Sequence, residues 1–152
     1  NGMVACALTK EYDIGVDLEW PTRFKNINSI AKRYFSNSEY NYLKASPLSE
    51  QREVFFTLWT LKESYLKAIG KGLRQPLDSF TFDLDTFNIS FVDKDVSQKK
   101  QFWNFALFRP SDVYICALCV AHPNNSPQNI EYQQVHWLDL DTRFSTSYTS
   151  KN

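Results

Sequence analysis

Two segments of the chain carry acidic and basic side chains at spacings that suit a chemical site. Asp17 and Glu19 are two residues apart in a strand-like run, which would point both carboxylates to one face. Glu63 and Lys67 are four residues apart in a helical run and therefore share a helix face. If strand and helix pack together, three carboxylates converge beside a lysine. Oxygen ligands of this kind suit Mg²⁺, and a carboxylate-held Mg²⁺ with a lysine nearby suits phosphate or pyrophosphate binding.

The helix that would carry Glu63 and Lys67 is marked by the spacing of its apolar residues. Pro47–Glu50 opens it, and Gly70 and Gly72 end it. Its expected apolar face contains Val54, Phe55, Leu58, Leu61, Tyr65, Leu66 and Ile69. Upstream, Ser36 with Glu39 three residues later has the pattern of a capping box, and Asn28-Ser29 is expected to cap a shorter helix.

The rest of the chain has the character of β-strands. Expected strands cover Val4–Leu8, Ile14–Leu18, Phe80–Leu84, Ile89–Phe91, Phe102–Phe108, Val113–Val120 and Val135–Leu138, with a polar loop over 92–100. This order predicts an α+β domain in which a long helix packs on an antiparallel sheet. The domain is expected to cover residues 1–140, followed by a polar tail over 141–152.

Composition excludes several classes of function. The 17 basic and 17 acidic residues balance, so no global positive field favours nucleic acid. No apolar run is long enough to predict a membrane span, and the first residues lack the features of a signal peptide. Cys116 and Cys119 would face opposite sides of a strand, so we interpret them as buried thiols of a cytoplasmic protein. The two histidines do not form a zinc-binding motif with each other or with paired cysteines, so the sequence does not predict a zinc site.

The same residues carry a family resemblance. The motifs are Gly15-Val16-Asp17-Leu18-Glu19, Ala31-Lys32-Arg33-Tyr34-Phe35-Ser36-Asn37-Ser38-Glu39-Tyr40, Trp59-Thr60-Leu61-Lys62-Glu63-Ser64-Tyr65-Leu66-Lys67-Ala68-Ile69-Gly70-Lys71-Gly72 and Pro76-Leu77-Asp78-Ser79-Phe80. In this order and separation they resemble the 4'-phosphopantetheinyl transferases, in particular the surfactin-synthetase type. The resemblance is sharp from about Val4 to Phe82 and diffuse afterwards.

The resemblance implies a reaction and residue roles. The expected activity is Mg²⁺-dependent transfer of 4'-phosphopantetheine from coenzyme A to a serine of an acyl or peptidyl carrier protein. Asp17, Glu19 and Glu63 are the expected metal ligands. Glu63, Lys67 and Glu19 are the expected catalytic residues, with the choice of general base left open. Lys67, Lys62 and Gly70 are expected to contact coenzyme A. The basic and apolar segment Phe24–Tyr34 is a candidate docking surface for the carrier protein.

The resemblance also leaves alternatives open. Surfactin-type enzymes have two similar halves with the active site between them, and this chain matches the second half, so a missing N-terminal half or a second subunit is an expected partner. A single-half trimer of the holo-acyl-carrier-protein-synthase type is another possibility. So are a truncated non-catalytic domain that binds carrier proteins or has a structural role, and an unrelated α+β domain whose acidic residues are coincidental. The pathway that the carrier protein serves is not indicated by the sequence.

Overall fold

The computed structural model describes residues 2–22, 24–86, 88–91, 102–122, 130–132 and 148–149. The described helices are α1 (Ile27–Tyr34), α2 (Asn37–Ala45) and α3 (Gln51–Ala68), with short 3-10 turns η1 (Gly72–Arg74) and η2 (Leu77–Ser79). The described strands are β1 (Ile14–Glu19), β2 (Phe80–Asp83), β3 (Asn88–Phe91), β4 (Phe102–Ser111), β5 (Tyr114–His122), β6 (Glu131–Tyr132) and β7 (Tyr148–Thr149).

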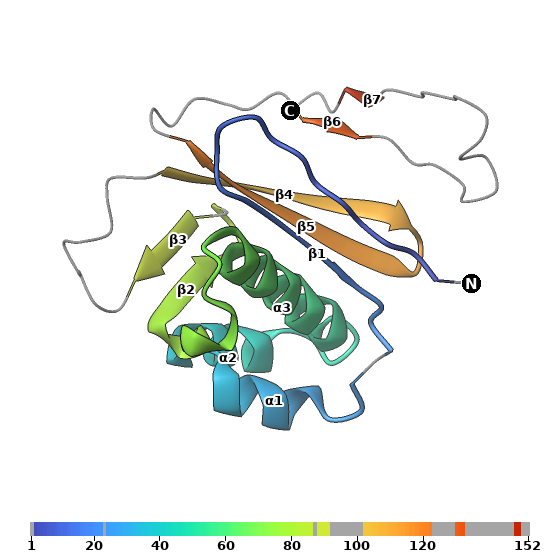
Figure 1. Ribbon diagram of the computed structural model, residues 1–152. Coiled ribbons are helices and arrows are strands. Elements are labelled where there is room, and N and C mark those ends of the chain that lie inside the picture. The colour runs from blue at the N-terminus through green and yellow to red at the C-terminus, as the bar shows by residue number, and fades with distance from the viewer. Residues whose placement is uncertain are drawn as a thin grey trace.

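The main sheet is antiparallel and has the strand order β1-β5-β4. β1 pairs with a strand that follows it by about a hundred residues, because Ile14 lies opposite Val120 and Glu19 lies opposite Ile115. β4 and β5 form a hairpin, and β2 with β3 forms a separate two-stranded hairpin. α3 lies along one face of the main sheet, and α1 and α2 lie on the far side of α3 (Figure 1).

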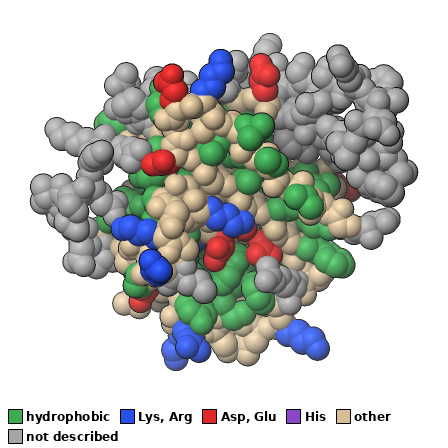
Figure 2. All heavy atoms as spheres, in the orientation of Figure 1, with side chains coloured by type: hydrophobic (Ala, Val, Ile, Leu, Met, Phe, Trp, Pro, Cys, Tyr) green, Lys and Arg blue, Asp and Glu red, His purple; other side chains and the backbone are tan. Residues whose placement is uncertain are grey.

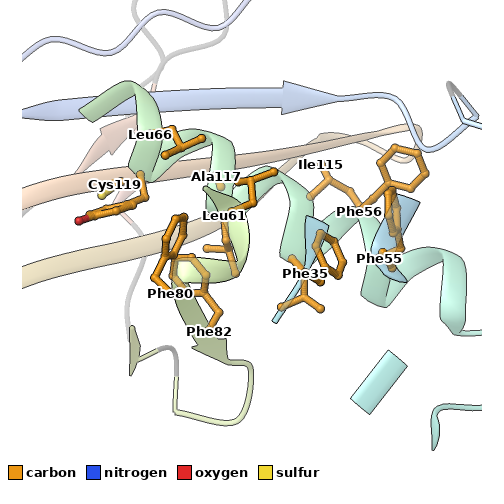
Figure 3. Packing of buried hydrophobic residues seen from close by; sticks show 14 of the residues in the cluster. Phe35, Phe55, Phe56, Leu61, Leu66, Phe80, Phe82, Ile115, Ala117 and Cys119 are labelled. Carbon is orange, nitrogen blue, oxygen red and sulfur yellow. The ribbon is translucent and has the colours of Figure 1, made fainter. Parts of the chain in front are cut away.

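The hydrophobic core fills the space around α3. On the sheet side Leu66 lies near Ala117 and Cys119 of β5, and on the other side Phe80 and Phe82 of β2 approach the helix (Figure 3). The side chains at 55, 56, 58, 61, 65 and 66 are almost fully buried. The predicted helical spacing is therefore confirmed, and burial of this much apolar surface fixes α3 between two layers.

Local signals in the sequence explain where the helices begin and end. The Ser36 hydroxyl accepts from the Glu39 amide while the Glu39 carboxylate accepts from the Ser36 amide, which confirms the capping box of α2. Asn26, and not the predicted Asn28-Ser29 pair, caps α1, because its side chain accepts from the Ser29 amide. Gly70 has a φ of 65°, a left-handed conformation that stops α3.

The predicted α+β class with a long helix on an antiparallel sheet is confirmed.

The predicted strand over Val4–Leu8 is wrong, since no strand is formed there. Alternation of apolar and polar residues indicates a segment that is buried on one side, but a strand also requires a neighbouring strand as its hydrogen-bonding partner. Here Val4 and Leu8 are about nine-tenths exposed. The predicted loop over 92–100 and strand over Val135–Leu138 lie outside the described residues. So does the tail over 141–152, apart from β7.

Among the described helices, none combines the length and the hydropathy that a membrane crossing requires. α3 is the longest of them, and it carries charged residues near its start and in its second half.

Candidate active site

β1 presents its acidic residues toward α3. Burial along the strand alternates, with Gly15, Asp17 and Glu19 buried and the residues between them half-buried. Asp17 is 6% exposed and Glu19 is 4% exposed, so both carboxylates lie in the interface between strand and helix. Because the side chains at i and i+2 share a strand face, the predicted common orientation of the two carboxylates is confirmed.

Gly15 allows this interface to be close. A Cβ atom at this position would lie 2.1 Å from the Ser64 carbonyl oxygen and 2.4 Å from the Ala68 amide nitrogen. Both neighbours are backbone atoms of α3, which cannot move away without displacing the helix. The glycine of the Gly15–Glu19 motif therefore has a packing role, because it sets the separation at which the acidic residues of β1 meet the helix.

Two residues of α3 bind the two carboxylates of β1 directly. The Trp59 indole Nε1 donates to Glu19 Oε1 at 3.2 Å, and Lys67 Nζ donates to Asp17 Oδ1 at 2.7 Å. Glu63 lies on the same helix face, four residues from each of them. The helix thus runs along β1 with Trp59 at the Glu19 end and Lys67 at the Asp17 end. Glu63 lies between these contacts, so all four predicted charged residues are brought to one interface.

Lys67 also contacts the backbone of β1. Its Nζ donates to the Val16 carbonyl at 3.0 Å, in addition to the Asp17 carboxylate. β1 is at the edge of the described sheet, so a carbonyl that points away from β5 needs another partner. The Lys67 side chain is 50% exposed, so the ammonium group reaches the surface as well as the interface. Acidic and basic side chains lie side by side near the centre of the face shown in Figure 2, surrounded by hydrophobic side chains.

The donor set at this interface suits a hard cation. Asp17, Glu19 and Glu63 supply only carboxylate oxygens, which Mg²⁺ prefers over nitrogen or sulfur. Within the described ranges, however, no group of three or more His, Cys, Asp or Glu side chains is close enough to hold one metal ion. The two strand carboxylates are instead engaged by Lys67 and Trp59. The predicted metal site therefore remains a prediction. Its carboxylate ligands suit Mg²⁺, but the contacts of Lys67 with Asp17 and of Trp59 with Glu19 would have to change for a metal ion to bind.

Lys62 lies on the other side of α3 from this interface. It is fully buried, and its Nζ donates to the Leu77 carbonyl at 2.7 Å and the Phe80 carbonyl at 2.6 Å. It also forms an ion pair with Glu39 Oε2 at 2.9 Å. Three contacts use the three N–H groups of an ammonium, so this geometry argues against the predicted coenzyme contact by Lys62. Burial lowers the pKa of Lys62 from its ordinary value, and the adjacent Glu39 carboxylate opposes that effect.

The buried position of Lys62 had a signal in the sequence. Leu58, Lys62 and Leu66 follow one another at intervals of four, so helical spacing places the lysine on the apolar stripe. A charge on such a stripe requires a buried partner. Glu39 supplies it, although the sequence indicated only a role for Glu39 in the capping box.

Gly70 lies at the exposed end of α3, three residues after Lys67. Its positive φ lets the chain leave the helix and enter η1. Nothing in this geometry brings a ligand to Gly70, so its predicted contact with coenzyme A stays a prediction.

The role of Trp59 as a partner of Glu19 was not predicted from the sequence. Its ring packs against Phe24, Phe35 and Phe55, with ring centroids 5.3, 6.5 and 5.8 Å away. Such a cluster restricts the rotation of the indole and thereby fixes the direction of its N–H group. Only this tertiary packing, together with the crossing of α3 over β1, points the indole at the carboxylate.

Comparisons with known proteins agree with this geometry. The family profile of the 4'-phosphopantetheinyl transferase superfamily matches residues 13–119. The chain is 32% identical over 143 residues to the 4'-phosphopantetheinyl transferase gsp of Aneurinibacillus migulanus, covering 93% of this chain and 59% of that protein. It is 37% identical over 122 residues to the 4'-phosphopantetheinyl transferase Sfp of Bacillus subtilis, covering 80% of this chain and 52% of that protein. The chain thus spans about half the length of the curated relatives it matches.

Solved structures share the fold at lower sequence identity. A holo-(acyl-carrier-protein) synthase from Bacillus anthracis, crystallised with CoA, has a TM-score of 0.58 at 19% identity, covering 72% of this chain and 94% of that chain. The holo-[acyl-carrier-protein] synthase of Thermotoga maritima has a TM-score of 0.58 at 21% identity, covering 89% of this chain and 76% of that chain. The family profile covers the β1 carboxylates, the α3 motif and the first part of the β5 strand, residues 114–119, which pairs with β1. On these grounds the chain belongs to the 4'-phosphopantetheinyl transferase superfamily and is of the Sfp-like type.

Proposed function

We propose that this chain takes part in transferring the 4'-phosphopantetheine arm of coenzyme A to a serine hydroxyl of an acyl or peptidyl carrier protein. The observation that supports this proposal is the meeting of β1 and α3, where Lys67 binds Asp17, Trp59 binds Glu19, and Glu63 lies between Trp59 and Lys67 on the same helix face. Because the chain spans about half the length of its relatives, the activity and partners of the whole protein are part of the proposal.

The reaction requires an in-line displacement at phosphorus. The serine oxygen forms a bond to the phosphorus that bears the pantetheine arm, and the bond from that phosphorus to the bridging oxygen breaks. The leaving group, 3',5'-ADP, takes the electron pair, and the hydroxyl proton passes to a base. Glu63 or Glu19 can accept that proton directly or through a water molecule, since both carboxylates lie at the interface. Which of the two is the base stays open.

The charged groups divide the remaining tasks. Asp17, Glu19 and Glu63 would hold Mg²⁺, which neutralises charge on the pyrophosphate when it is bound. Lys67 has a half-exposed side chain and can turn from Asp17 toward a phosphate oxygen, where its positive charge stabilises the charge that develops during transfer. Trp59 holds Glu19 in a fixed direction through its indole N–H.

The exposed face of α1 is the candidate docking surface for the carrier protein. Lys25, Lys32 and Arg33 are exposed, and Arg33 lies over the Tyr34 ring at 5.2 Å. The Tyr34 ring lies 6.5 Å from the Trp59 ring, so this basic surface adjoins the residue that binds Glu19. An acidic carrier protein that docks there would place its serine near the carboxylates.

The test is a transfer assay read by mass spectrometry. Apo carrier protein is incubated with the chain, coenzyme A and Mg²⁺, with and without a chelator, and the carrier is weighed. A mass gain of one phosphopantetheine arm that disappears with chelator and in Asp17→Asn and Glu63→Gln supports the proposal. Asp85→Asn is the matched control, because Asp85 is an exposed carboxylate in the turn between β2 and β3. A mass gain that survives in both site variants would contradict the proposed site.

A second candidate function is binding of a carrier protein without transfer. It is favoured by the contacts of the β1 carboxylates, because Lys67 binds Asp17 and Trp59 binds Glu19, and no group of three metal-ligating side chains is found among the described residues. Calorimetry distinguishes the two functions, because carrier binding without any mass gain supports the non-catalytic alternative. Light scattering on the same sample tests the trimeric alternative, since holo-acyl-carrier-protein synthases share the fold of this chain.

A further inference from the structure

A buried ion pair on the far side of α3 connects four elements of the fold. Lys62 of α3 pairs with Glu39 of α2 at 2.9 Å, with side-chain exposures of 0% and 1%. The same ammonium donates to the carbonyls of Leu77 in η2 and Phe80 in β2. No other contact described here joins α3 to so many neighbouring elements through one atom.

Glu39 is equally well satisfied. Its Oε2 accepts from the Ser36 amide at 2.9 Å and from the Ser36 hydroxyl at 3.0 Å, in addition to Lys62. Its Oε1 accepts from the Phe82 amide at 2.8 Å. The carboxylate therefore connects the start of α2 to β2, and it also pairs with the ammonium group of Lys62 on α3. The pair is a closed polar network with defined hydrogen-bond directions at each end.

Stability alone does not require such a network. Removing two charges from water is costly, and an apolar pair of similar volume often stabilises a core equally well. What an apolar pair cannot provide is direction, because aliphatic side chains tolerate small rotations and shifts of the helix that carries them. A cation with three fixed acceptors tolerates neither. The aromatic rings of Phe80 and Phe35, 4.3 and 5.8 Å from Lys62 Nζ, further confine it.

The direction of Lys62 determines the direction of the site residues. Successive residues of an α-helix are turned by about 100°, so a fixed Lys62 also fixes the adjacent Glu63. Trp59 and Lys67 lie on the Glu63 face, where they meet Glu19 and Asp17. We infer that Lys62 and Glu39 are positioning residues, which hold α3 in the rotation that presents Glu63 and Lys67 to the carboxylates of β1. The catalytic consequence rests on the proposed function, but the structural consequence does not.

The first test measures position without using activity. In Glu39→Gln/Lys62→Met the two side chains keep their approximate shape and lose their charges. The reporter is the Trp59 indole N–H, which donates to Glu19 and is assigned in the NMR spectrum by comparison with Trp59→Phe. We expect a changed indole chemical shift and about tenfold faster hydrogen exchange, as the helix is released from one rotation. An indole with wild-type shift and exchange overturns the inference.

Thr60→Val is the matched control. Thr60 is also fully buried on α3, but its hydroxyl donates to the Phe56 carbonyl within the same helix and connects no other element. In Thr60→Val the Trp59 indole signal should keep its wild-type chemical shift. If Thr60→Val changes the indole chemical shift and exchange rate as much as the double variant does, then the loss of any buried polar group on α3 has this effect, and the inference fails. If the double variant does not fold, Glu39→Gln alone is measured by the same criterion, because it removes one charge and keeps Lys62.

The second test measures the catalytic consequence in the transfer assay. We expect the double variant to lower kcat about tenfold or more while the KM for coenzyme A changes by less than about twofold, since misplacement affects the reacting geometry more than ligand binding. An unchanged kcat in a folded double variant overturns the catalytic part. If the wild-type chain shows no transfer, the proposed function fails, and the indole measurement still decides the positioning role.

Discussion

Lys67 and Asp17 form the direct charge contact between the two motifs, with Nζ 2.7 Å from Oδ1. The two residues are fifty positions apart in the sequence, and their contact brings the last turn of α3 to the middle of β1. Asp17 is buried and Lys67 is half-exposed, so the pair joins the interior of the interface to its surface. Under the proposed function, a metal ion bound by Asp17 would take over this carboxylate, and Lys67 would then be placed to bind a phosphate.

The Lys67–Asp17 pair should matter more for activity than for stability. Half-exposed ion pairs contribute less than about 1 kcal/mol, so we expect a coupling free energy of this size from a double-mutant cycle with Lys67→Met and Asp17→Asn in urea unfolding. Each single variant should lower kcat/KM about a hundredfold. Arg109→Met is a control, since Arg109 pairs with Glu53 at the surface. Wild-type activity in Lys67→Met would contradict the assigned role.

Gly15→Ala should destabilise the protein by about 2–4 kcal/mol, because the new methyl group meets the backbone of α3 and separates the helix from β1. Unfolding in urea measures the loss of free energy. Gly2→Ala is the matched control, as a Cβ at Gly2 meets nothing within 4 Å. If Gly15→Ala is as stable as Gly2→Ala, the strand and the helix do not approach each other as described.

The cysteines should differ in reactivity. Cys6 is exposed, whereas Cys116 and Cys119 are buried in β5 on opposite faces of the sheet, as predicted from the sequence. Burial raises the pKa of both β5 thiols and suppresses the reactive thiolate. A thiol reagent at neutral pH should label one cysteine rapidly in the native protein and three after unfolding, and Cys6→Ser should abolish the rapid phase. Rapid native labelling of that variant would disprove the buried placement.

The stability of the protein should decrease at alkaline pH. Burial, with a further contribution from the nearby Asp17 charge, raises the pKa of Cys116 from its ordinary 9.0 to about 11. The folded state therefore holds this proton more tightly than the unfolded state does. The associated stabilisation is complete below pH 9 and is lost as the pH rises through about 11.

The expected loss from this group is at most about 3 kcal/mol between pH 9 and 11. Urea unfolding across this range measures it, and Cys116→Ala should have a shallower pH dependence than the wild type. Tyr65, whose pKa burial raises from 10.0 to about 12, adds a loss that begins at about pH 10 in both proteins. Identical slopes for the two proteins would show that Cys116 does not contribute.

Much of the local structure could be predicted from the sequence. The capping box at Ser36 and Glu39, the length of α3 and its end at Gly70 depend on residues close together in the chain. The shared faces of Asp17 with Glu19 and of Glu63 with Lys67 follow from strand and helix periodicity. The sequence by itself therefore determined which side chains could act together within each element.

Only the tertiary structure decided how the elements meet. The pairing of β1 with β5, the approach of α3 to Gly15 and the capture of Glu19 by Trp59 join residues far apart in the chain. Local periodicity cannot distinguish which apolar faces will bury one another, because any two such faces gain free energy on contact. For the same reason Lys62 and Glu63, neighbours in one motif, have different partners: one belongs to the buried network of α2 and β2, and the other faces β1.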